Sequence, residues 1–201
     1  MKRVLLSLTV GSIALTTVLQ ERAIAFYNKT LSAEGLESLK DEYRRNLKAG
    51  KVSIENNSSK GESKWRKAFV DSWKKAGHEG ANWLGTWNSD RGTALVQIYP
   101  STQKTTRVCI VTIAMEGESE FRLGHVNRGA VYLDDGSLLF PEKGKLIQTM
   151  YPGPRFYQLT PSSQALSKSF DRPSFPPGMR KLRQVIDRQI SDEGCTTSMP
   201  E

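Results

Sequence analysis

The sequence predicts a mainly β protein in which an antiparallel meander closes into a small barrel of about eight strands, with helices packed outside it. Between Trp83 and Leu159, apolar and polar residues alternate with a period of two, which is typical of strands. Turn-forming residues divide this stretch into short segments, and the connections are too short for crossover helices, so we expect consecutive strands to pair. The segments before and after it show helical periodicity instead.

Residues 1–25 have the organisation of a secretory signal peptide. Basic residues precede a largely apolar run, Val4–Leu19, and Ala23 and Ala25 are small residues at the two positions that determine cleavage. We therefore expect cleavage near Ala25 and export to a periplasm, a lumen or the medium. The alternative is an uncleaved N-terminal anchor, although this run is shorter than the roughly 20 residues of a membrane span.

The first zone of the mature chain, residues 26–80, is predicted to be a helical N-terminal segment. Ser32 is a suitable N-cap, acidic residues follow it in the first turn, and Gly50 ends the helix. Spacings of three and four residues place one apolar stripe on this helix, formed by Leu36, Leu39, Tyr43 and Leu47.

A second helix is predicted from about Glu62 to Ala76, with Trp65, Phe69 and Trp73 on one face and basic residues around them. This pattern has two interpretations. In one, the helix is a partner surface formed by Trp65, Arg66, Lys67, Trp73 and Lys74. In the other, the aromatic residues pack on the barrel and the lysines are solvated. Export argues against nucleic acid as a partner.

The barrel is predicted to occupy residues 81–160. Its turns carry glycine, aspartate, asparagine and serine, and Asp134-Asp135-Gly136 contains the Asp-Gly pair that suits a tight hairpin turn. The predicted strands are 83–88, 93–100, 106–114, 119–126, 129–134, 137–141, 144–150 and 155–159.

The last zone, residues 161–201, is predicted to be an extension with one helix from Met179 to Ile190. Cys109 and Cys195 are the two cysteines of the chain, and in an exported protein they are expected to form one disulfide. Two unrelated free thiols are the alternative. A disulfide would fix the C-terminal extension to the barrel.

The segment Arg107–Ala114 is apolar on both alternating faces. Val108 and Ile110 share one face, and Cys109 and Val111 share the other. A strand of this kind is covered on both sides. The helix that ends just before Cys195 is therefore predicted to lie on the face of Cys109.

Gly85-Thr86-Trp87, at the start of the meander, resembles the opening strand of calycin-type barrels, the lipocalins and avidins. The resemblance implies that the indole of Trp87 lies at the closed end of the barrel. The longer phrase up to Thr93 is similar to the first hairpin of avidin-type biotin binders. Those sites enclose biotin with tryptophans from later strands, and no tryptophan follows Trp87, so biotin binding is not implied.

No catalytic residue, metal site or cofactor is predicted. His78 and His125 are the two histidines, which excludes a site built from several histidines, and no phosphate-binding loop or activated nucleophile motif is present. The chain carries a net charge of +8, which keeps it soluble and also permits peripheral contact with an anionic surface.

The pattern therefore favours an exported, non-enzymatic binding module of lipocalin-like shape for a small apolar or amphipathic ligand. The alternative is an exported protein-interaction module, such as an inhibitor or an accessory subunit of an envelope assembly, with a filled barrel. An enzyme is a third candidate, and the oligomeric state stays open. The predicted ligand cavity is lined by Val96, Ile98, Val108, Ile110, Phe121, Leu123, His125, Tyr132 and Phe140.

Overall fold

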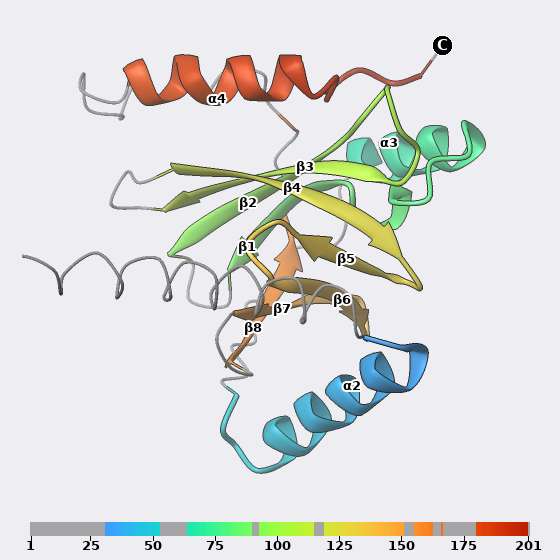
Figure 1. Cartoon of the computed structure of the whole chain (residues 1–201), viewed down its shortest axis with the longest axis vertical. Helices are drawn as coiled ribbons and strands as arrows, with labels where there is room; N and C mark the ends of the chain where they lie inside the picture. The colour runs from blue at the N-terminus through green and yellow to red at the C-terminus, as the bar shows by residue number, and fades with distance from the viewer. Residues whose placement is uncertain are drawn as a thin grey trace, which may run out of the picture. The chain divides into compact units, whose positions relative to one another are not determined.

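The protein is a closed barrel of eight antiparallel strands, in which each strand pairs with the next and β8 pairs with β1 (Figure 1). This confirms the fold class predicted from the sequence. The computed structural model describes residues 31–52, 64–89, 93–114, 119–150, 155–162, 166 and 180–200. The predicted signal peptide and its cleavage position near Ala25 lie outside these residues.

The chain divides into two compact units, Met1–Asp41 and Glu42–Glu201, and the second contains the whole barrel. The division falls within helix α2. Ser32, which precedes this helix, is the predicted N-cap, and its hydroxyl oxygen accepts a hydrogen bond from the backbone N–H of Gly35. The elements are α2 (Ala33–Lys48), α3 (Lys64–Lys75), the 3₁₀ turn η1 (Ala81–Trp83), β1 (Gly85–Ser89), β2 (Ala94–Pro100), β3 (Arg107–Ala114), β4 (Ser119–Asn127), β5 (Ala130–Leu133), β6 (Leu138–Glu142), β7 (Lys145–Met150), β8 (Arg155–Pro161) and α4 (Arg180–Asp192).

The first strand begins later than predicted. Ala81–Trp83 forms a 3₁₀ turn, and Gly85 has a φ of 114°, a backbone conformation that L side chains rarely adopt. Glycine at this position therefore lets the chain turn from η1 into β1. The other seven strands agree with the predicted segments to within a few residues.

The register shows which side chains face the barrel interior, because residues paired across neighbouring strands point to the same face. Cys109 is bonded to the C-terminal extension outside the barrel, so its partners Tyr99 and Leu123 also point outward. The alternate set points inward and is buried: Trp87, Val96, Ile98, Val108, Ile110, Val126, Val131, Leu133, Leu139, Leu146 and Leu159.

The interior is tightly filled around Gly124. A Cβ atom at this position would lie 2.5 Å from Cγ1 of Val131 and 2.8 Å from Cγ2 of Val108. Both distances are shorter than van der Waals contact, so glycine is needed here for the valines of the flanking strands β3 and β5 to pack over β4. At this level the barrel is a packed core.

Helix α4 covers the outer face of β2, β3 and β4 (Figure 1). Its residues Ile186 and Ile190 are buried in the same apolar cluster as Val111 and Ile113 of β3. Val185 of the same helix points away from this cluster and is 53% exposed. The prediction that the terminal helix covers the face of Cys109 is confirmed.

The C-terminal extension is fastened to the turn between β2 and β3. Cys195 is disulfide-bonded to Cys109 across a sequence separation of 86, which confirms the predicted pairing. Backbone hydrogen bonds join Thr102 N–H to the Gly194 carbonyl at 2.8 Å and Thr196 N–H to the Pro100 carbonyl at 3.1 Å. The Arg107 guanidinium and the Glu193 carboxylate add an ion pair of 2.6 Å.

The disulfide is compatible with export to an oxidising compartment. Among the described residues, the structure contains no helix with the length and apolar character needed to cross a membrane.

Replacing both cysteines with alanine is expected to destabilise the protein. Loop-closure entropy gives about 4 to 5 kcal/mol for a loop of this size. Urea unfolding of the double variant measures the loss. Peptide mapping of the parent protein without reductant should recover the Cys109–Cys195 peptide pair, and two free thiols there would contradict the assignment.

Gly124→Ala is expected to lower the free energy of unfolding by about 1 to 3 kcal/mol, because the new methyl group overpacks the interior. Val131→Ala in the same chain removes the closest atom. A double-mutant cycle by urea unfolding should therefore show favourable coupling of about 0.5 kcal/mol or more between the two changes. Strictly additive losses would mean that the interior at this level is not tightly packed.

Candidate functional site

The end of the barrel at which β1 begins, called here the capped end, is closed by η1 and α3 (Figure 1). Trp87 points into the interior, and its indole N–H donates a 2.8 Å hydrogen bond to the carbonyl of Trp83 in η1. The Arg66 guanidinium of α3 lies over the Trp87 ring, 4.4 Å from its centroid. Such a cation–π contact contributes about 0.5 to 2 kcal/mol.

Gly85 allows Arg66 to reach this position. A Cβ atom on Gly85 would lie 2.9 Å from Cδ and Nε of Arg66, so any side chain there would displace the arginine. Arg66 also donates from Nη2 to the carbonyl of Asn82 at 3.1 Å. Gly85 and Trp87, the first and last residues of Gly-x-Trp, therefore form the contact through which Arg66 of α3 packs on the capped end.

The predicted partner surface on α3 is wrong for two of its five residues. Arg66 and Trp73 are 5% and 6% exposed, and Trp73 donates its indole N–H to the carbonyl of Ser198. Trp65 is half-buried and stacks on Phe69. Lys67 and Lys74 are exposed. The aromatic residues thus pack on the barrel, as the second interpretation of this helix expected.

His78, between α3 and η1, is buried and 4% exposed. Its Nε2–H donates to the carbonyl of Arg107 at 3.1 Å, and its Nδ1 accepts from the backbone N–H of Gly80 at 3.1 Å. Both ring nitrogens are used by the neutral imidazole. Burial lowers the pKa of His78 below its ordinary value of 6.5, against smaller opposing effects of the Arg107 carbonyl and Glu79.

Nine residues were predicted to line a ligand cavity, and the register separates them into two groups. Val96, Ile98, Val108 and Ile110 point inward and are buried. The prediction is wrong for the other five, which point outward: Phe121, Leu123, His125, Tyr132 and Phe140.

The outward direction has a physical reason in each covered region. Phe121 and Leu123 pack against the apolar cluster that includes α4. Phe140 meets Tyr43, with ring centroids 6.1 Å apart, and Tyr43 also accepts a 3.0 Å hydrogen bond from Gln158. Helical residues therefore cover apolar side chains on two parts of the outer face, where Phe140 is fully buried and Phe121 and Leu123 are partly buried.

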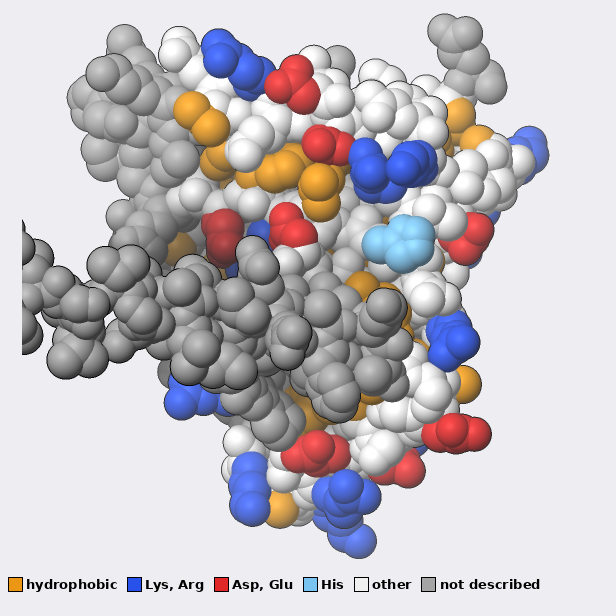
Figure 2. All heavy atoms as spheres, viewed as in Figure 1, with side chains coloured by type: hydrophobic (Ala, Val, Ile, Leu, Met, Phe, Trp, Pro, Cys, Tyr) orange, Lys and Arg blue, Asp and Glu red, His pale blue; other side chains and the backbone are white. Residues whose placement is uncertain are grey.

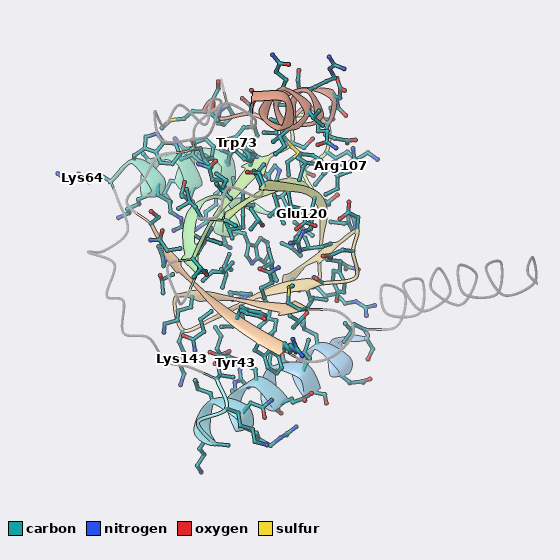
Figure 3. The ribbon with its side chains drawn as sticks, turned by 90° about the vertical axis from the view of Figure 1, so that its left-hand side faces the viewer. Tyr43, Lys64, Trp73, Arg107, Glu120 and Lys143 are labelled. Carbon is teal, nitrogen blue, oxygen red and sulfur yellow. A yellow bond between two sulfur atoms is a disulfide. The ribbon has the colours of Figure 1, made fainter. Side chains whose placement is uncertain are left out.

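The opposite end of the barrel, called here the distal end, presents polar and amphipathic side chains to the interior. The inward set on β4 begins with Glu120 and Arg122, which pair with Thr112 and Ile110 of β3. Seen from this end, Glu120 lies just inside the ring of strands (Figure 3). The register places seven side chains on the inward face of this distal site: Thr112, Glu120, Arg122, Gln148, Met150, Arg155 and Tyr157.

Two inward-facing side chains at the distal end are partly exposed to solvent. Met150 and Tyr157 point inward and are each 37% exposed. Their outward-facing neighbours Thr149 and Phe156 are only 1% and 9% exposed. In a filled barrel the inward-facing side chains are the buried ones. The exposure of Met150 and Tyr157 therefore distinguishes the distal end from the part of the interior that is packed around Gly124.

Arg122 is a buried charged residue of the distal site. Its side chain is 8% exposed, and it forms ion pairs with Asp135 through Nη1 at 2.8 Å and with Glu120 through Nη2 at 2.6 Å. The second oxygen of Asp135 accepts the backbone N–H of Ser137 at 2.8 Å, which fixes this carboxylate in the β5–β6 turn. The Nε atom of Arg122 is buried and has no hydrogen-bond partner among the described residues.

The distal site is not among the sites predicted from the sequence. The available signal was the placement of Arg122 between the apolar residues Phe121 and Leu123 in a strand. That alternation indicates two faces and does not say which is inside. In the described part of the chain, no three His, Cys, Asp or Glu side chains are grouped in a way that would hold a metal ion.

Acidic and basic side chains are interspersed around α4 and the strands beneath it on the face shown in Figure 2. Searches with the chain against protein-family models, curated proteins and solved structures returned no match. The closed eight-stranded antiparallel barrel is compatible with a calycin-like fold.

The buried His78 predicts a loss of stability in mild acid. The pKa of His78 is lower in the folded than in the unfolded state. Its contribution to the free energy of unfolding is therefore fully present above about pH 6.5 and is lost as the pH falls through the folded-state pKa. The slope from this one group is at most about 1.4 kcal/mol per pH unit. Urea unfolding between about pH 4 and about pH 8 should show this slope in the free energy of unfolding.

His78→Gln should flatten that part of the profile, whereas His125→Gln, at an exposed position, should leave it unchanged. An identical acid slope in the His78 variant would contradict the assignment.

Proposed function

We propose that this protein is an exported, non-enzymatic binding module of calycin-like shape that holds a small amphipathic molecule in the distal end of its barrel. The observation that carries the proposal is the exposure of the inward-facing side chains at this end, beside a packed capped end. A β-barrel holds a small ligand where its interior is not filled by its own side chains.

The side chains of the distal site fit an amphipathic molecule. Met150 and Tyr157 supply apolar and aromatic surface, and Tyr157 adds a hydroxyl group. Gln148, Glu120 and Arg122 supply hydrogen-bonding groups. Ligand sites in proteins combine apolar contact with a few polar groups of this kind, which fix orientation.

The packing around Gly124 limits the size of the ligand. Val108, Val131 and Leu133 meet over this glycine and leave no room even for a methyl group. A molecule entering at the distal end therefore stops above this level. This excludes a long ligand that spans the whole barrel.

A protein-interaction module, such as an inhibitor or an accessory subunit of an envelope assembly, is the second candidate. The packed capped half favours it, because such a protein needs no hollow interior. Native mass spectrometry of the protein purified from its source separates the two. A retained small molecule supports the binding module, and a co-purifying protein supports the second candidate.

Gln148→Trp is expected to block the distal site, because an indole at an inward-facing position occupies the space of the ligand. Binding of the neutral fluorescent probe N-phenyl-1-naphthylamine should weaken by about tenfold or more. Lys104→Trp introduces the same side chain on the exposed β2–β3 turn and should bind the probe like the parent protein.

Urea unfolding establishes that both variants are folded. Equal probe binding by the two tryptophan variants, or no binding by the parent protein, would overturn the assignment of the ligand site to the distal end.

A further inference from the structure

We infer that Arg122 anchors a carboxylate group of the bound molecule, and that Glu120 takes the place of this carboxylate when no ligand is present. This inference rests on the proposed function, since it names the chemical class of the molecule held in the distal site. It starts from the unused hydrogen-bonding capacity of one buried guanidinium.

A guanidinium group binds a carboxylate best through two parallel N–H bonds. Nη2 is the terminal nitrogen on the same side as the Nε–H bond, so these two nitrogens form one such fork. In Arg122 the Nη2 position is occupied by a single oxygen of Glu120 at 2.6 Å, and Nε has no partner among the described residues. The fork of Arg122 is therefore half used.

Leaving a buried donor without a partner costs about 1 to 3 kcal/mol. A carboxylate with both oxygens facing the fork would satisfy Nε and Nη2 together. Glu120 can be displaced from Nη2 because its side chain is 57% exposed. Asp135, which binds Nη1 of Arg122, is instead held by the backbone N–H of Ser137. Exchange of Glu120 for a ligand carboxylate also keeps the charge around the guanidinium constant.

The surroundings define the rest of the ligand. Met150 and Tyr157 face the same interior as Arg122 and are partly exposed, so an apolar chain attached to the carboxylate can contact them. Together these groups fit an amphipathic carboxylate, with its head on Arg122 and its apolar part on β7 and β8.

Isothermal titration calorimetry on the full chain tests this inference with two probes of equal chain length, dodecanoate and 1-dodecanol, both below their aggregation concentrations. Glu120→Gln removes the competing negative charge and should tighten dodecanoate binding by about tenfold without changing dodecanol binding. Arg122→Gln should weaken dodecanoate by about tenfold or more and affect dodecanol much less. Glu79→Gln, an exposed change at the capped end, is the matched control and should alter neither.

Urea unfolding shows whether the Arg122 variant is folded, and the Glu120 variant tests the inference even if it is not. If both probes bind and the Glu120 and Arg122 variants change them equally or not at all, the carboxylate anchor is wrong while the binding function stands. If neither probe binds the parent protein and no amphipathic molecule is retained from the source, the proposed function fails as well.

Discussion

The outer face of β2–β4 is the constraint on which the rest of this structure depends. Side chains such as Tyr99, Val111 and Ile113 point away from the barrel and are nevertheless buried, so this face needs a permanent cover. Helix α4 supplies the cover, and the Cys109–Cys195 bond and the hydrogen bonds to the β2–β3 turn hold it in place. Strand β3 is apolar on both faces, and both are buried because one faces the barrel interior and the other lies under α4.

This arrangement also explains why the interior has room for polar groups. Since α4 on one region and Tyr43 on another bury apolar side chains outside the barrel, the interior is not the only site for apolar residues. The strand β4 shows the consequence most clearly, with Phe121 and Leu123 outside and Arg122 inside. Glu120 and Asp135 balance the charge that would otherwise be buried alone.

The two ends of the barrel differ in chemistry for related reasons. At the capped end, Gly85, Trp87 and Arg66 form a contact that closes the interior under α3. At the distal end, the inward-facing Met150 and Tyr157 are partly exposed, and Arg122 and Glu120 add charged groups. This difference between the two ends is the geometric basis of the proposed binding function, in which the ligand is held at the distal end.

The sequence by itself determined the architecture. Period-two alternation and regular turns gave eight consecutive strands, and two cysteines in a predicted exported chain gave the disulfide, because both inferences use local pattern and residue identity. Only the tertiary structure decided which face of β4 is inside, which of the α3 residues are buried, and that Arg122 lies in the barrel. Alternation separates two faces without saying which one a neighbouring helix covers, and the packing of α3 and α4 on the barrel settles that choice.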